Sequence, residues 1–251
     1  MLPQLIGFAA WGLLVGVIVG FTAIGTALLG IPGLIVLFRV PAVPAVGSMA
    51  VAGFFMMVSG TLQHYRNGNV LASVALPFAA TAVPGSYIAA TYARAINELV
   101  PLETILGAVI IVSVLVLFYR YIIMRAKPRE LSLPRWKFML SPMLGLVLGV
   151  LMGATSISGS IIVIAFIMLL KLPSPQAVGT TSFVAAVSLL VASVAHIQQA
   201  NVEWLVVAGL TPGMFVGATL GARYVDRLPR QALRVSILVI LFVAGIMVFF
   251  G

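Results

Sequence analysis

The heptapeptide HYRNGNV at residues 64–70 returns as HIQQANV at residues 196–202, and histidine occurs nowhere else in the chain. His64 and His196 lie 132 residues apart in a sequence of 251 residues. Further matches at the same offset are AVGS (45–48) with AVGT (177–180), Asn69 with Asn201, Gly85 with Gly217, and Tyr92 with Tyr224. Matches of His, Asn and Tyr are rarer by chance than matches of Ala, Val or Leu, so they predict an internal duplication. The predicted parts are a first repeat over 1–125, a basic cytoplasmic linker over 126–137 and a second repeat over 138–251.

The composition indicates a protein that crosses a membrane several times. Hydrophobic residues make up 62% of the chain and charged residues 8%, whereas soluble domains have about 25% charged residues. Apolar stretches separated by short polar breaks are typical of multispanning proteins. They cover residues 4–38, 43–65, 70–93, 101–124, 138–170, 176–198, 202–225 and 232–250. No Lys or Arg precedes the first stretch, so we expect it to be retained rather than cleaved as a signal peptide.

Two apolar stretches, 4–38 and 138–170, are too long for one crossing each. A straight helix over 4–38 would be about 52 Å long, against a hydrocarbon core of about 30 Å. Small and hydroxyl residues interrupt both stretches, as FTAIGT at 21–26 and as ATSISGS at 154–160. We therefore expect each helix to break there. Glycine faces that we interpret as close helix packing precede the breaks, with Gly12, Gly16 and Gly20 in one repeat and Gly145, Gly149 and Gly153 in the other.

The distribution of basic residues predicts how the repeats are oriented. If each long stretch crossed the membrane once, seven Lys and Arg residues would lie on each side. If each instead enters and returns, Arg39 and Arg94 lie alone on one side and the other twelve lie on the opposite side. The second arrangement fits the rule that cytoplasmic loops carry the basic residues. It places both termini outside, and it predicts an all-α polytopic membrane protein of two inverted repeats. Each repeat has a broken or re-entrant first segment followed by three transmembrane helices.

The breaks are the first candidate for a binding site. A helix that restarts inside the membrane aims free N–H groups and its positive dipole end into the protein, which favours an anion. Hydroxyl groups add donors, and glycine lets a ligand approach the backbone. The candidate substrate-binding residues at the breaks are Thr22, Gly25, Thr26, Thr155, Ser156, Ser158, Gly159 and Ser160. The alternative is that these small residues only allow close helix packing.

Hydroxyls and histidines of the following helices are the second set of candidates. Ser48, its counterpart Thr180, and Thr181 lie one turn into the helix after each returning segment, where we expect contact with the substrate. The alternative is a hydrogen bond from each hydroxyl to its own helix. His64 and His196 end matching helices and are candidate gate or entry residues, with an interfacial side chain reaching water as the alternative. The two asparagines that follow them are interpreted as turn or cap residues.

The acidic residues are informative because they avoid the centres of the apolar stretches. The whole set is Glu98, Glu103, Glu130, Glu203 and Asp226, all in loops or near helix ends. A site without charged side chains and rich in hydroxyl donors favours a small anion over a cation. It argues against an intramembrane hydrolase, which needs an acid pair, a metal cluster or an activated nucleophile. With no cysteine and with histidines at opposite ends, we expect no metal, no cofactor and no enzymatic activity, and we expect no nucleic-acid partner.

The chain resembles the sulfite exporter TauE/SafE family of bacterial and archaeal membrane transporters. The resemblance spans nearly the whole sequence, and these stretches carry it: GFTAIGTALLGIPGL, VPAVGSMAVAGF, HYRNGNV, LPSPQAVGTTSF, AHIQQANVEWL and GATLGARYVDRLP. It implies a permease in the cytoplasmic (inner) membrane for sulfur-containing oxyanions or organosulfonates, such as sulfite or sulfoacetate. The first break has fewer glycines than the family's GxGGG-like run, with Thr22 and Thr26 alongside Gly25, which puts the identity of the anion in doubt.

These observations together predict a secondary transporter or exporter that works by alternating access between the two repeats. Its expected partners are a small inorganic or organic sulfur anion and membrane lipid, the latter contacted by the basic linker. A membrane anchor subunit that does not transport, or an anion channel, are the alternatives. The sequence leaves open the direction of transport, the coupling ion and whether the protein forms a homo-oligomer.

Overall fold

The structure is a computed structural model of the chain. It describes residues 2–22, 25–119, 135–157, 162–163, 165–166, 170, 172, 174–224 and 230–250. Within these ranges the regular structure is entirely helical, which confirms the predicted all-α class. Five of the described helices are long and apolar enough to cross a membrane, or six if the bent pair α5 and α6 forms one span.

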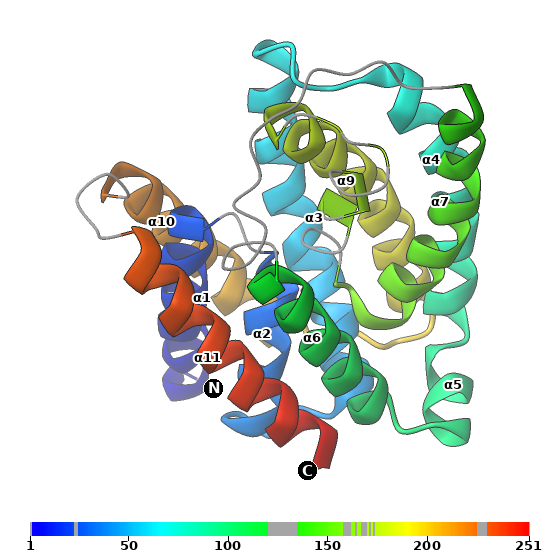
Figure 1. Cartoon of the computed structure of the whole chain (residues 1–251). Helices are drawn as coiled ribbons and strands as arrows, with labels where there is room; N and C mark the ends of the chain where they lie inside the picture. The colour runs from blue at the N-terminus through cyan, green and yellow to red at the C-terminus, as the bar shows by residue number, and fades with distance from the viewer. Residues whose placement is uncertain are drawn as a thin grey trace.

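The helices follow the predicted apolar stretches closely (Figure 1). In chain order they are α1 (Leu2–Thr22), α2 (Thr26–Val36), α3 (Ala42–Arg66), α4 (Ala72–Thr91), α5 (Ala93–Leu99), α6 (Leu102–Phe118), α7 (Arg135–Thr155), α9 (Ser174–Gln198), α10 (Trp204–Tyr224) and α11 (Arg230–Phe250). The short helix α5 was not expected from the sequence. It turns by 92° into α6 at Pro101, where the Asn97 side chain accepts a hydrogen bond from the first N–H of α6 at 2.8 Å.

Both long apolar stretches break where the sequence predicts. In the first, α1 ends at Thr22 and α2 begins at Thr26. In the second, α7 ends at Thr155, and Ser156 adopts a positive φ of 54° that no helix continues through. The predicted restart of a helix near residue 160 lies outside the described residues.

The helix α2 runs back alongside α1. Trp11 in α1 donates its indole N–H to the carbonyl of Gly30 in α2 at 3.2 Å, and Gly7 lies against the ring of Phe38, just beyond α2. Because the lower-numbered residue of α1 meets the higher-numbered residue, the two helices are antiparallel. The first stretch therefore enters and returns, and α2, with 11 residues or about 16 Å of helix, is a half-span.

Two helix pairs between the halves are parallel and joined by glycines. Gly12 and Gly16 place α1 against the backbone of α10 at Leu210 and Met214. Gly145, Gly149 and Gly153 place α7 against the backbone of α4 at Phe78, Ala82 and Ser86. A Cβ atom at any of these glycines would collide with the facing backbone, so the packing interpretation of both faces is confirmed for the five glycines whose surroundings are described.

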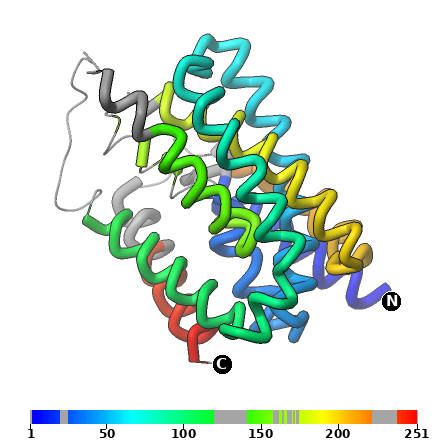
Figure 2. Tube along the Cα trace, turned by 90° about the vertical axis from the view of Figure 1, so that its right-hand side faces the viewer, coloured from blue at the N-terminus to red at the C-terminus, as the bar shows by residue number. Residues whose placement is uncertain are grey.

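Two other pairs between the halves are antiparallel. In the first, Gly47 of α3 lies near His196 of α9, and Gly60 lies near Ser182. In the second, α6 and α11 are neighbours in both views (Figures 1 and 2), and Gly107 of α6 meets Phe249 near the end of α11. Every major contact between helices of the two halves thus joins α1 with α10, α3 with α9, α4 with α7 or with α9, or α6 with α11.

Candidate functional site

The first break places the start of α2 beside the middle of α3. Gly25 is the N-cap residue of α2 and supplies no side-chain cap, so the positive end of the helix dipole is not balanced by a capping side chain. Thr26, the first helical residue, is 4% exposed. A Cβ atom on Gly53 would lie 3.7 Å from its Oγ1. Thr22 ends α1, and its side chain lies outside the described set.

The second break is held by two buried hydroxyls. Thr155 donates to the carbonyl of Leu151 at 2.6 Å, and its oxygen accepts from the N–H of Ile157 at 3.3 Å. Ser156 donates to the carbonyl of Val46 in α3 at 2.9 Å and is 2% exposed. Its left-handed backbone is unusual for a residue other than glycine, and such strain is concentrated at functional sites. Ser158, Gly159 and Ser160 lie outside the described residues.

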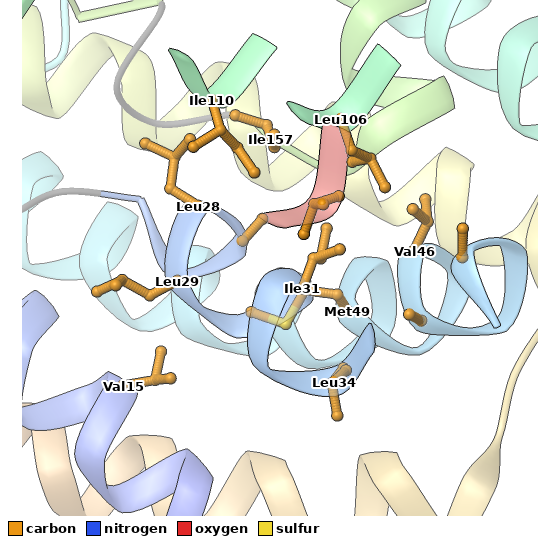
Figure 3. Packing of buried hydrophobic residues seen from close by; sticks show 14 of the residues in the cluster. Val15, Leu28, Leu29, Ile31, Leu34, Val46, Met49, Leu106, Ile110 and Ile157 are labelled. Carbon is orange, nitrogen blue, oxygen red and sulfur yellow. The ribbon is translucent and has the colours of Figure 1, made fainter. Parts of the chain in front are cut away.

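The helix α3 connects the two breaks. Val46, which contacts the second break, and Gly53, which lies beside the first, are seven residues apart, or about 10 Å along the helix. Leu28 from the first turn of α2 and Ile157 from the second break belong to one buried apolar cluster, together with Ile110 of α6 (Figure 3). The fold therefore brings two regions together that are more than 120 residues apart in the sequence.

Ser48 and Thr180 hold the loop of the opposite half. Ser48 Oγ accepts from the N–H of Glu203 at 2.8 Å, before α10, and Thr180 Oγ1 accepts from the N–H of Leu71 at 3.0 Å, before α4. The two bonds are equivalent at the offset of 132 residues. Neither hydroxyl makes the predicted alternative bond to its own helix. Thr181 is 2% exposed, and its Oγ1 has no hydrogen-bond partner among the described residues.

Two glycines missed in the sequence reasoning complete these contacts. Gly47 packs against the carbonyl of Asn201, and Gly179 packs against the carbonyl of Asn69. A side chain at either position would displace the loop, so the neighbouring hydroxyls could no longer reach their N–H donors. The offset that pairs the histidines also pairs these glycines, and that was the available signal.

The two histidines occupy the last turns of α3 and α9, as predicted. The carbonyls of His64 and His196 accept hydrogen bonds from the N–H groups of Asn69 and Asn201 at 2.9 and 2.8 Å. These bonds close a helix C-terminal motif, which confirms the turn interpretation of both asparagines. The His196 side chain is fully buried, and its Nε2 lies 3.3 Å from the carbonyl of Gly153 in α7. His196 therefore does not reach water in this structure, whereas His64 is partly exposed.

Comparison with known proteins matches the sulfite exporter TauE/SafE family model over residues 8–248, a range that includes both breaks and both repeats. The chain belongs to the sulfite exporter TauE/SafE family. It is therefore a multi-pass membrane protein of a transporter family.

Full-length relatives agree with this assignment. The probable membrane transporter protein YdhB of Bacillus subtilis (strain 168) is 26% identical over 94% of the chain and 97% of its own length. The probable membrane transporter protein YjnA of the same organism is 29% identical over 91% of the chain and 94% of its own length. No solved structure matches the chain.

Proposed function

We propose that this TauE/SafE protein is a secondary transporter for a small sulfur-containing anion, such as sulfite or an organosulfonate. The observation that carries the proposal is the start of α2, a helix N-terminus with no capping side chain that lies buried beside the middle of α3. The polar side chains buried among the described residues are Ser, Thr, His and Asn, without Asp, Glu, Lys or Arg. Neutral donors around a positive dipole end favour an anion.

We propose that the substrate binds between the two breaks, with Gly25, Thr26 and Ser156 closest to it. Thr22, Thr155, Thr181 and the residues Ser158, Gly159 and Ser160 complete the proposed lining. Ser48 and Thr180 act through the loops that their hydroxyls hold, and we assign them a positioning role. His64 and His196 remain proposed gate residues because each ends a helix that crosses the other half.

We propose that residues 1–125 and 138–251 form inverted repeats. The support is the helix pairing: matching helices α3 and α9 are antiparallel, and so are α6 and α11. The pair α1 and α10 has the pair α7 and α4 as its equivalent, with the same parallel direction and the same glycine contacts. Inverted repeats around broken helices are a common transporter architecture, with substrate bound near the midplane.

Alternating access follows from the burial of the proposed site. Thr26 and Ser156 are at most 4% exposed, so a solute reaches them only when helices move apart. A movement of one repeat against the other would open the site to one side at a time. In the cytoplasmic membrane we propose both termini outside and the 126–137 linker inside, because α3 ends and α7 begins at the end of the bundle away from both termini (Figure 1).

Thermal stabilisation of the purified protein tests the proposal. Sulfite, thiosulfate, sulfate, sulfoacetate and phosphate are added separately, and a ligand at 100 times its Kd stabilises the folded state by about 2.7 kcal/mol. We expect a sulfur-containing anion to raise the unfolding temperature of the wild type. The Thr26→Val variant should lose this increase. Ser113→Ala, which removes a buried hydroxyl of α6 that bonds to its own helix at 2.6 Å, should keep it. A folded wild type that responds to no oxyanion would contradict the proposal and favour an anchor subunit.

A further inference from the structure

Two buried nitrogen atoms at one end of the bundle lack hydrogen-bond partners. They are Nδ1 of His196 and Nδ2 of Asn201, on residues that are 0% and 1% exposed. An unpaired buried polar group is unfavourable by about 1–3 kcal/mol. The two residues are also joined through their backbones, because the N–H of Asn201 donates to the carbonyl of His196 at 2.8 Å. The molecule therefore holds a pair of unused polar atoms at one place.

The orientation of the Asn201 amide is fixed by Arg94. The Arg94 Nε donates to Oδ1 of Asn201 at 2.6 Å, and its Nη2 donates to the carbonyl of Ala200 at 3.1 Å. Because the amide oxygen accepts this bond, the unpaired atom is the amide nitrogen, which can only donate. Arg94 is exposed in α5, so a positive charge stands at the surface directly beside a buried donor.

His196 connects this pair to the second break. Its Nε2 faces the carbonyl oxygen of Gly153 at 3.3 Å, two residues before α7 ends. A carbonyl only accepts hydrogen bonds, so Nε2 carries the proton and Nδ1 is the acceptor of the neutral ring. The backbone of Asn201 and the Cβ of His196 both lie against Gly47 of α3, next to Val46, which Ser156 contacts. The polar groups thus run from the surface to the break.

We propose that Arg94, His196 and Asn201 form a second anion site, an outer station for the substrate next to the second break. This inference rests on the proposed transport function. The class of ligand is a small oxyanion that can also carry a proton. Its oxygens accept from Asn201 Nδ2 and are attracted by Arg94, and its hydroxyl, as in hydrogen sulfite, donates to His196 Nδ1. At the offset of 132 residues the counterpart of Arg94 is Asp226, so we assign the station to one end of the transporter.

The test is sided transport with the Asn201→Asp variant. This change keeps the acceptor for Arg94 and replaces the donor nitrogen with an anionic oxygen. Uptake of radiolabelled sulfite is measured in right-side-out and in inverted membrane vesicles. We expect the KM for entry from the outer face to rise about tenfold, the effect of losing one good hydrogen bond. We expect the KM from the inner face to change less than twofold and the unfolding temperature to stay at the wild-type value.

Two further variants control for charge and structure. Arg94→Gln should also raise the outer KM. Arg39→Gln removes the charge of another exposed arginine, which the same topology places outside, and should leave it unchanged. A wild-type outer KM in Asn201→Asp would overturn the station, as would equal changes from both faces with a lowered unfolding temperature. If the wild type itself transports no oxyanion, the proposed function fails, and the station fails with it.

Discussion

At the residue scale, the recurrence of HYRNGNV and HIQQANV is explained by backbone geometry. In each copy the fifth residue, Gly68 or Ala200, has a positive φ, 68° and 52° respectively. Its N–H donates to the carbonyl of the second residue, Tyr65 or Ile197, at 3.0 and 3.1 Å. This is the helix C-terminal motif in which glycine is usual, because a Cβ atom is unfavourable in the left-handed conformation. The second copy therefore stores strain at Ala200.

Exchanging these two residue types should change stability in opposite directions. We expect Ala200→Gly to increase the free energy of unfolding by about 0.5–1 kcal/mol, because relief of left-handed strain exceeds the entropy cost of glycine. Gly68→Ala should decrease it by a similar amount, since no atom lies within 4 Å of the added methyl group and strain alone acts. Thermal unfolding in detergent measures both. A lower unfolding temperature for Ala200→Gly would show that its backbone is not strained.

At the element scale, glycine faces set how closely the helices of the two halves approach. The backbone of α7 touches that of α4 at Gly149 and Ala82, and the same contact recurs between α1 and α10. Packing without side chains lets van der Waals contacts and nearby backbone groups stabilise helix pairs, where lipid provides no hydrophobic drive. These faces are therefore fixed contacts between the repeats, and movement during transport must preserve or slide along them.

A methyl group on this face should separate the helices. We expect Gly149→Ala to destabilise the protein by roughly 1–3 kcal/mol, since its Cβ collides with the carbonyl of Ala82 and backbone atoms cannot rotate away. Gly60→Ala is the matched control, because its nearest contact would be Ser182 Oγ at an ordinary 3.8 Å. Unfolding temperature and monodisperse yield in detergent report on both. Equal behaviour of the two variants would argue against tight packing of α7 on α4.

At the scale of the whole molecule, the enter-and-return path of the first stretch decides the topology. Because α2 is an antiparallel half-span, α1 and α2 together make no net crossing, and α3 starts on the same side as α1. Arg39 then lies at the end of the bundle that holds the N-terminus, as the count of basic residues predicts. The proposed orientation of both termini depends on this single feature.

Labelling of single cysteines tests this topology cleanly, since the natural chain has none. Leu99→Cys, at an 84% exposed position at the end of α5, should react with an impermeant maleimide on right-side-out vesicles. Arg66→Cys and Arg230→Cys should react only after permeabilisation, because both positions are proposed to lie inside. Labelling of Arg66→Cys and Arg230→Cys from opposite sides would refute the inverted arrangement.

The sequence by itself determined the helical membrane class, the positions of both breaks, the glycine packing and the family. These features depend on local composition, on the length of apolar stretches and on repeated spacing, all of which can be read along one chain. It did not indicate α5, whose turn depends on Pro101 and a side-chain cap, or the bond that fixes Arg94 on Asn201.

Only the tertiary structure decided which partner each buried hydroxyl and histidine finds. Ser48 and Thr180 hold loops of the opposite half, and His196 faces α7 instead of water. The physical reason is that a buried polar group must take whatever donor or acceptor the crossing helix presents. In Ser48 and Glu203 that partner is 155 residues away, and no local pattern specifies it.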